Sequence, residues 1–548
     1  MTASPSRPAP PPSGRASDAL LQRKLGTFSV ATLTYGMVGS GWLFASYYAA
    51  QAAGPLSLVS WLIAGGATAL VALVFIELGI ARPLSGGPVR WPQLSGGPFL
   101  GALVGWTLLL QAAVGTPSEA AGLLQYGAQW WPQLYHGDSL TAAGLVVAIA
   151  VMAAFTGLGF LGVRTFATIN NITTVVKFVV PALTIVLLIG SGFDHTNLTG
   201  HGGFTPYGFS AALPAIIGGG LIYCFGGINS AATMAGEVAN PRRTLPRGIF
   251  LGFGTAFCVY FGLQLALLGA VPHGQLLHGW QGVNFHSPFA QLAMLLNLGW
   301  LSWMILADAV YSPAISLFAG ITQQGRNTYG LATNHALPST LAHVHRRSGI
   351  PRRAMLLNIV VGTIALLAFR NWHSLVSALG MFFAISYAVA SVAVMVFRTA
   401  DRETRAPVIP GMRIIAPISF VISALITYWS GWPEARMAIG LFALALPLYG
   451  VLLLLDRRHH SIAGLRAGLW FFVFMMFIGA MSYLGSFSGR DLVGAPWDSL
   501  IVAAGALVAY AVGLRVGVRW MTAHQADRDA PPAPAAAGAP GPIGTVTP

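Results

Sequence analysis

The sequence predicts an all-α polytopic membrane protein that crosses the bilayer about fourteen times. The chain is 55% hydrophobic and only 8% charged, with a mean hydropathy of +0.68. An ordinary soluble protein is far less apolar and more highly charged. The apolar residues form runs of the roughly 20 residues that a spanning helix needs, and the basic residues gather in alternate loops.

Short polar loops separate the apolar runs. The segment 354–370 is close to the lower length limit, and only a short turn separates it from 374–397, so it stays open whether both cross the membrane. The predicted spans are 27–51, 56–80, 99–125, 140–162, 168–192, 211–236, 247–271, 289–320, 354–370, 374–397, 414–431, 435–455, 467–486 and 498–518.

The distribution of basic residues supports this order of spans. With the N-terminus in the cytoplasm, the inner loops and tails hold most of the 29 Lys and Arg residues, whereas the outer loops hold only Arg370, Arg436 and Arg490. This asymmetry follows the positive-inside rule and predicts a multi-pass protein of the plasma (inner) membrane with both termini in the cytoplasm. The net charge of +14 is then explained by topology and by contact with membrane lipid, and no nucleic-acid partner is predicted.

The sequence does not predict an enzyme. It contains no HExxH zinc site, GxSxG elbow, P-loop or CxxC pair. The longest internal loop, 325–353, is below the roughly 40 residues that usually fold unaided. Cys224 and Cys258 both fall in predicted spans, and the 13 histidines are scattered. No disulfide, metal site or other cofactor is expected.

Two predicted spans carry helix-breaking residues near their centres. The first span contains Gly-Ser-Gly at 39–41, and the sixth contains Phe-Gly-Gly at 225–227. An interrupted helix exposes backbone groups that hydrocarbon cannot pair, so protein, water or ligand must satisfy them. Glycine-interrupted spans at matching positions of two halves indicate a transporter binding site. The triple glycine at 218–220 is expected to serve helix packing.

The two breaks lie five spans apart, as a five-plus-five inverted repeat requires, with discontinuous spans one and six. Four further helices would then be peripheral. Both ends of the chain are rich in Pro, Ala and Gly and are expected to be disordered cytoplasmic tails. The predicted units are the tail 1–25, the first repeat 26–192, the second repeat 211–398, the peripheral spans 414–518 and the tail 519–548.

The segments around the breaks resemble the amino acid-polyamine-organocation (APC) superfamily of permeases. The matching segments are GSGWLFASYYAAQAAGP in the first span, ELGIARPLSGGPVRW after the second, FGGINSAATMAGEVANPRRTLPRGI in the sixth and GRNTYGLATNHALPSTLAHVHRRSGIPRRA between the eighth and ninth. They occur in the family's order over residues 26–400. Fourteen spans, where twelve are more usual, resemble the aspartate/proton symporter-like branch.

The resemblance implies an amino acid site between the two breaks. Backbone amides of the first break would receive the substrate α-carboxylate, and carbonyls of the sixth span would receive the α-ammonium. Tyr223 or Phe225 would close over the substrate. Some members carry Glu where this chain has Asn229, so coupling through that Glu is not implied. The predicted substrate-binding residues are Gly39, Ser40, Gly41, Tyr223, Cys224, Phe225, Gly226 and Asn229.

Three ionisable residues at membrane depth are candidates for proton coupling, because such residues are costly to bury and usually functional. Lys177 resembles a fifth-span lysine that replaces a sodium ion in some family members, and it would bridge the first and eighth spans. Its alternative is a snorkelling lysine near the cytoplasmic end. Glu119 and Asp308 could carry the proton or balance a cationic substrate. Glu119 could instead bond to neighbouring helices.

We therefore expect a secondary active amino acid transporter that couples to protons and works by alternating access. An amino acid exchanger is the alternative within the same class. A non-transporting amino acid receptor with the same fold is the alternative from another class, although its expected cytoplasmic domain is missing from the sequence. The sequence leaves open which amino acid or polyamine is bound, whether sodium replaces the proton, and the oligomeric state.

Overall fold

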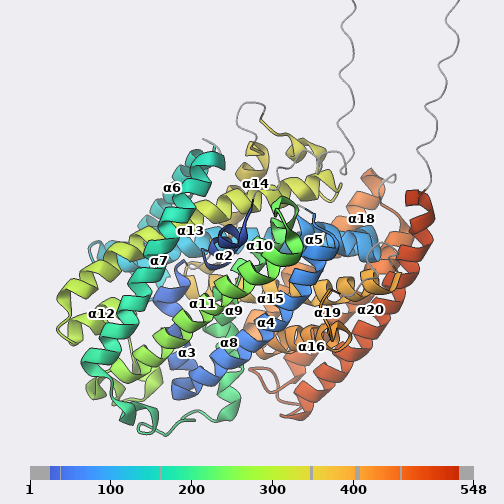
Figure 1. The fold of residues 1–548 in the computed structure, drawn as a ribbon. Helices are drawn as coiled ribbons and strands as arrows, with labels where there is room; N and C mark the ends of the chain where they lie inside the picture. Colours follow the sequence, from blue (N-terminus) through green and yellow to red (C-terminus); the bar gives the residue numbers. More distant parts are fainter. Residues whose placement is uncertain are drawn as a thin grey trace, which may run out of the picture.

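A computed structural model of the chain is almost entirely helical (Figure 1). It describes residues 25–36, 39–84, 86–160, 163–345, 350–400, 408–456 and 460–529, with the backbone alone for 163–172 and 525–529. The strands β1 (Tyr135–His136) and β2 (Ser139–Leu140) form a small hairpin between two helices. Twelve helical runs within the described residues are long and apolar enough to cross a membrane.

Most of the helices follow one another with short connections, and the longest connections are 193–213, 271–287 and 334–351. Those in the first half are α2 (Thr27–Tyr35), α3 (Gly41–Ala53), α4 (Ser57–Ala81), α5 (Gly87–Gly127), α6 (Ala142–Gly159), α7 (Val163–Gly192), α8 (Pro214–Gly218), α9 (Leu221–Cys224) and α10 (Gly227–Thr233). The rest are α11 (Pro241–Ala270), α12 (Pro288–Leu295), α13 (Gly299–Thr333), α14 (Arg352–Phe369), α15 (Trp372–Ala400), α16 (Met412–Trp429), α17 (Trp432–Ala443), α18 (Ala445–Leu455), α19 (Ile462–Leu484) and α20 (Trp497–Asp529).

The twelve long runs correspond to most of the predicted spans. Both uncertain segments are present, as α14 and α15. The first and sixth predicted spans are built from short helices, and α3 enters the count joined to α4 through a 3-10 turn at Gly54–Leu56. The structure therefore supports a multi-pass helical membrane protein. The total of fourteen spans and the inverted repeat stay predictions.

Two helices extend past the ends that hydropathy predicted. Helix α13 continues to Thr333, although the apolar run ends at residue 320, because polar side chains on its last turns face other helices and a cavity instead of water. Helix α20 continues to Asp529, past the predicted end of the last span at residue 518. The remaining parts of the two predicted tails, 1–24 and 530–548, lie outside the described residues.

Helices α5 and α15 form the centre of the molecule. Every residue in the most apolar window of α15 is buried, and most of the corresponding window of α5 is buried as well. Helix α5 bends at Gly96 and Gly97, where Gly97 has a left-handed φ of +87°. Helices α16, α19 and α20 pack together on one side of this centre, in the orange and red part of Figure 1. The two broken helical segments lie against the centre, which places their breaks inside the protein.

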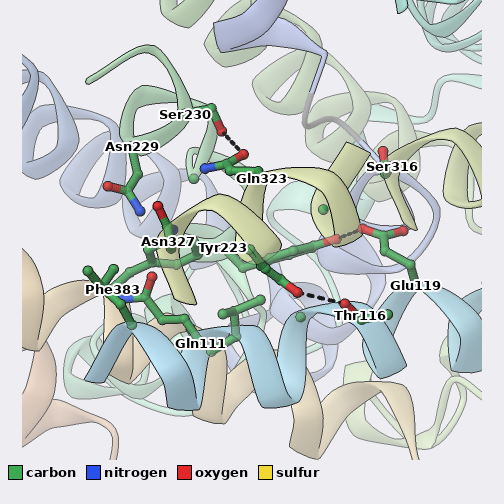
Figure 2. Close-up of a pocket in the computed structure, with 16 residues that line it drawn as sticks. Gln111, Thr116, Glu119, Tyr223, Asn229, Ser230, Ser316, Gln323, Asn327 and Phe383 are labelled. Atoms are coloured by element: carbon green, nitrogen blue, oxygen red, sulfur yellow. Dashed lines mark hydrogen bonds between the residues drawn. The ribbon is translucent and has the colours of Figure 1, made fainter. Parts of the chain in front are cut away.

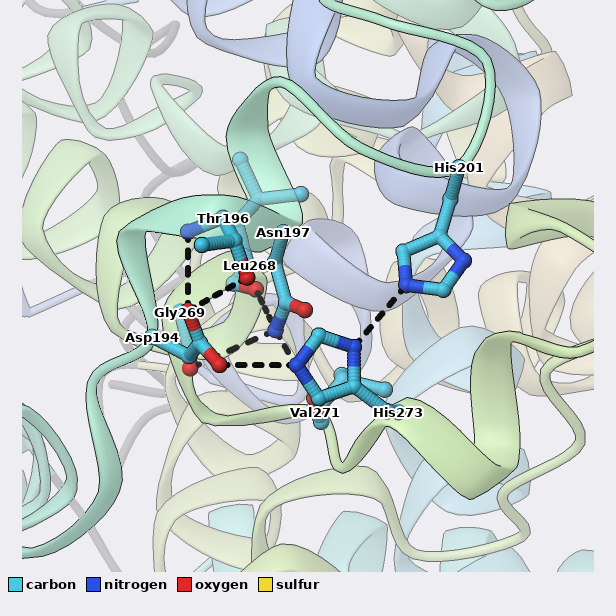
Figure 3. Close-up of polar contacts among 8 residues, drawn as sticks. All are labelled: Asp194, Thr196, Asn197, His201, Leu268, Gly269, Val271 and His273. Carbon is cyan, nitrogen blue, oxygen red and sulfur yellow. Dashed lines mark hydrogen bonds and ion pairs between the residues drawn. The ribbon is translucent and has the colours of Figure 1, made fainter.

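The loop after α7 is tied to the end of α11 by polar contacts (Figure 3). The Asn197 side-chain amide donates to carbonyls at the C-terminus of α11, which are those of Leu268, Gly269 and Val271. Nearby, Asp194 pairs with His273 at 2.8 Å, and the His273 ring lies 3.0 Å from a ring nitrogen of His201. The Thr196 hydroxyl and N–H, together with His273, lower the pKa of the Asp194 carboxyl to about 2. The last carbonyls of a helix have no hydrogen-bond donor within the helix. Because Asn197 supplies such a donor, it stabilises this end of α11.

Candidate functional site

The first broken helix ends at Tyr35 and resumes at Gly41, as the glycine pattern predicted. The N–H of Ser40, directly before α3, donates to Oε2 of Glu119 at 2.9 Å. Free amides and the positive dipole end of a helix N-terminus favour an anion at this place. An amide predicted to receive a substrate carboxylate therefore holds the carboxylate of a side chain from α5.

The glycines of this break permit close approach of other elements. A Cβ added to Gly39 would lie 2.5 and 2.6 Å from the two carboxylate oxygens of Glu119 and 2.7 Å from Cβ of Ser316. A Cβ added to Gly41 would lie 2.9 Å from the sulfur of Cys224. Any side chain at Gly39 would thus enter the space that the Glu119 carboxylate occupies.

The second broken helix has two interruptions. Helix α9 ends at Cys224 and α10 begins at Gly227, which is the break that the Phe-Gly-Gly segment predicted. The triple glycine at 218–220 also breaks the chain, because Gly220 has a left-handed φ of +73° between α8 and α9. The expected close packing is present as well, because a Cβ added to Gly220 would lie 2.5 Å from Cγ1 of Val376. The triplet therefore both packs and interrupts the helix. Gly227 lies so close to α2 that an added Cβ would be 1.8 Å from the carbonyl oxygen of Thr34.

A hydrogen-bonded network joins the two breaks. The Tyr223 hydroxyl donates to Oε1 of Glu119 and lies 3.4 Å from the hydroxyl of Ser40. The indole N–H of Trp372, on α15, donates to the same Ser40 hydroxyl at 2.7 Å. Of the two gate candidates, Tyr223 lies in this network, whereas the Phe225 ring packs against aromatic side chains of α4 and α11.

The carbonyls predicted to bind a substrate ammonium lie beside this network. The Tyr223 carbonyl accepts from Gly226 N–H at 2.9 Å, and the Phe225 carbonyl accepts from Ile228 N–H at 3.3 Å. A carbonyl has two lone pairs, so one accepted hydrogen bond does not use the full accepting capacity of either group. The Cys224 side chain is buried beneath α3.

Lys177, on α7, lies behind the first break and is 1% exposed. Its ammonium donates to the carbonyl of Gly36, at the C-terminal end of α2, at 2.9 Å and to the Ser316 hydroxyl of α13 at 2.6 Å. These are the bridging contacts expected between the first and eighth predicted spans. A cation at a helix C-terminus is favourable. A snorkelling lysine would keep its ammonium in water, whereas the side chain of Lys177 is buried.

Asp308 occupies a different place from the other two ionisable candidates. Its carboxylate accepts from the Trp42 indole N–H at 3.1 Å and from the Ser312 hydroxyl at 2.9 and 2.8 Å. It is buried, and it does not line the cavity described next. These contacts fasten α3 to α13 just beyond the break.

A cavity bordered by α5, α9, α10, α13 and α15 leads to Glu119 and Tyr223 (Figure 2). Gly226 and Asn229 of the predicted site also line it. Glu119 is the acidic residue among those that line the cavity, and none of the lining residues is Lys or Arg. Its neutral polar side chains are Gln111, Thr116, Asn229, Ser230, Ser316, Gln323, Gln324 and Asn327.

Of the carboxamides in this cavity only Asn229 was predicted from the sequence. Trp372, Gln111, Gln323, Gln324 and Asn327 were not. The available signal was a set of amides within or next to apolar runs, as in LLLQAAV around Gln111 and ITQQGRN around Gln323 and Gln324. Outside the two breaks only charged residues were considered at membrane depth, and Gln323 and Gln324 lie beyond the predicted end of the eighth span at residue 320. In the described parts of the chain, no group of three or more His, Cys, Asp or Glu residues is placed to hold a metal ion.

Comparison with known proteins places this site in a family context. Residues 25–453 match the family model described as amino acid permease. The glutamate/serine transporter AimA of Bacillus subtilis is 33% identical over 91% of this chain and 94% of its own length. The aspartate-proton symporter of the same organism is 31% identical over 89% of this chain and 95% of its own length.

A solved structure shares the fold. A point mutant of the manganese transporter of Eremococcus coleocola aligns with a TM-score of 0.51 over 82% of this chain and 94% of that chain. The sequences are only 14% identical. This similarity therefore concerns the arrangement of helices and not the substrate.

Proposed function

Because the chain belongs to the amino acid permease family of the APC superfamily, we propose that it is a proton-coupled amino acid symporter working by alternating access. Family and relatives make it a membrane transporter of amino acids and not an enzyme. The finer proposal rests on one observation, which is that the Glu119 carboxylate accepts the Ser40 N–H at the first helix break.

Glu119 and a substrate carboxylate compete for the same donor in this proposal. Ionised Glu119 accepts hydrogen bonds from Ser40 N–H and from the Tyr223 hydroxyl. Two carboxylates placed there together would repel each other strongly at low dielectric. A proton on Glu119 removes its charge and lets the side chain leave the amide. Substrate and proton therefore bind together, and the empty transporter returns with Glu119 back on Ser40.

Lys177 has a structural role in this scheme. Its ammonium holds the end of α2 and the Ser316 hydroxyl of α13 together, where a bound cation would otherwise be needed. This arrangement supports coupling to protons instead of sodium. The buried Asp308 fastens α3 to α13 and is not assigned a proton-carrying role.

The domain organisation follows from the same proposal. Units 26–192 and 211–398 would be the inverted repeats that alternate around the site, with 414–518 as a peripheral part and both tails in the cytoplasm. The relative named an aspartate-proton symporter supports the proton as coupling ion. For a substrate without net charge, symport with one proton moves one charge, and crossing about 100 mV supplies about 2.3 kcal/mol, which supports roughly fortyfold accumulation at about 1.4 kcal/mol per tenfold ratio.

The test is uptake of radiolabelled aspartate into proteoliposomes under an imposed inward proton gradient. Unlabelled acidic, neutral and basic amino acids serve as competitors, and a protonophore serves as control. We expect accumulation that the protonophore abolishes. Uptake seen only in vesicles preloaded with an amino acid would replace symport by exchange. Saturable binding without uptake under either condition would support the receptor alternative.

A further inference from the structure

We propose that Gln324 selects substrates whose side chain ends in an oxygen that accepts hydrogen bonds, a carboxylate or a carboxamide. The inference rests on the proposed function, because it takes the cavity at Glu119 as the substrate site. It names the substrate class that the sequence leaves open.

The carboxamide of Gln324 is oriented by Thr116. The Thr116 hydroxyl donates to Oε1 of Gln324 at 2.7 Å, which leaves Nε2 to donate. Nε2 lies against the glycine surface of α5, because a Cβ added to Gly115 would be 3.0 Å away. Among the described residues Nε2 has no hydrogen-bond partner, and Gln324 lines the cavity. Gln324 therefore offers an N–H donor at the wall of the cavity, beside Gly115.

The distance of this donor from the carboxylate position fits an amino acid side chain. Thr116 and Glu119 are three residues apart on α5, so they share one helix face and differ by about 4.5 Å along the axis. Figure 2 shows both residues on the same helix. The Thr116 hydroxyl donates a hydrogen bond to a side chain that lines the cavity, and the Glu119 carboxylate accepts one from Tyr223. A substrate whose α-carboxylate replaces Glu119 at Ser40 would carry a second oxygen group about one helical turn away, next to Gln324.

The hydrogen-bonding groups of the cavity favour an accepting side chain over a basic one. No Lys or Arg lines the cavity, so an acidic side chain would be held by neutral donors. A lysine or arginine side chain would instead bring further N–H donors to the Gln324 donor, which cannot accept them. With Glu119 protonated for substrate binding, no negative charge would remain in the lining to balance a basic side chain.

Gln323 provides a matched control. It is the neighbouring residue of the same type and also lines the cavity, and its carbonyl accepts the Ser230 hydroxyl of α10 at 2.9 Å. In Figure 2 the Ser230–Gln323 pair lies across the cavity from Thr116 and Glu119. Loss of Gln323 should therefore disturb the cavity without removing the donor next to the substrate side chain.

The experiment measures displacement of radiolabelled aspartate from the purified full-length protein by unlabelled aspartate, glutamate, asparagine, glutamine and alanine. For Gln324→Leu we expect about tenfold or more weaker binding of the four substrates with an accepting side chain, while alanine is unchanged. Gln323→Leu changes the wall of the cavity at Ser230, so it should shift the affinities of all five ligands, alanine included, by a common factor and leave the selectivity unchanged. Gln324→Glu replaces the donor by an acceptor and should weaken the binding of aspartate and glutamate most. This variant therefore separates recognition of a carboxylate from recognition of a carboxamide. The melting temperature of each variant checks folding.

Equal weakening of all ligands including alanine by Gln324→Leu would overturn the inference, and so would wild-type protein that binds alanine as tightly as aspartate. Binding is measured without a membrane, so it is independent of transport. Selective binding without proton-driven uptake would leave the inference standing and reject symport. Proton-driven uptake by the wild type, together with unchanged binding selectivity in Gln324→Leu, would support symport and reject the inference.

Discussion

Substitution of Gly39 by Ala adds a single methyl group beside the hydrogen bond between Ser40 N–H and the Glu119 carboxylate. The added carbon would lie 2.5 and 2.6 Å from the two Glu119 oxygens. Nonbonded carbon–oxygen contacts are rarely shorter than about 3.3 Å, so the carboxylate must move by about 0.7 Å or more. The Ser316 Cβ, at 2.7 Å, closes the other side. Any carboxylate bound to Ser40 N–H, whether from Glu119 or from substrate, is therefore displaced.

The size of the effect follows from the hydrogen bond that is lost. A hydrogen bond to a charged group contributes about 1.5 to 3 kcal/mol, which corresponds to roughly tenfold or more in affinity. We expect Gly39→Ala to raise the KM for uptake by at least about tenfold. The matched control is Gly66→Ala in α4, where an added Cβ would meet nothing within 4 Å.

The assay is initial-rate uptake of labelled amino acid into proteoliposomes, with melting temperatures in detergent as a measure of folding. Gly66→Ala should keep the wild-type KM. A folded Gly39→Ala protein with the wild-type KM would show that no carboxylate binds at this amide during transport.

Three further predictions concern other contacts of the structure. Tyr223→Phe removes the hydroxyl that donates to Glu119 but keeps the ring, so proton-driven uptake should fall about three- to tenfold with an unchanged melting temperature. Lys177→Met removes the ammonium that donates to the Ser316 hydroxyl and to the end of α2, so the unfolding free energy should fall by about 1–3 kcal/mol, which a denaturation series would measure; equal stability would exclude the bridging role. Asp194 has its pKa lowered to about 2 in the folded protein, so its carboxylate stabilises the fold above its ordinary pKa and loses this effect as pH falls toward 2. Asp194→Asn should therefore lower the melting temperature at neutral pH, with a difference that shrinks from about pH 4 downward; a pH-independent difference would contradict this.

The helix breaks could be predicted because their signal is local. Gly39 and Gly41 flank one residue in an apolar run, and Gly226 and Gly227 interrupt the sixth predicted span in a similar way. Backbone that leaves a helix within hydrocarbon needs partners, so the pattern alone indicated a binding place. The additional break at Gly220 was not predicted, since composition does not distinguish a glycine with a left-handed φ from one that only permits close packing.

The partners of the breaks could not be predicted from local pattern. Glu119 lies 79 residues after Ser40 in the chain, and its carboxylate reaches the Ser40 amide only because α5 packs against the first break. Trp372 comes from still further along the chain. Gln324 was left outside the eighth predicted span because hydropathy declines where α13 turns a polar face to the cavity. A single-sequence hydropathy profile does not distinguish that face from a surface loop.

The most direct test of the account is the behaviour of Glu119→Gln in proteoliposomes. Glutamine keeps the shape of the side chain and can still accept the Ser40 N–H, but it cannot carry a proton at neutral pH. Two quantities are compared with wild type, namely accumulation driven by an inward proton gradient and exchange of labelled for unlabelled amino acid at equal concentrations without a gradient. The account predicts that accumulation is lost while exchange continues. Protonophore-sensitive accumulation at the wild-type level in Glu119→Gln would contradict the assignment of the coupled proton to this carboxylate.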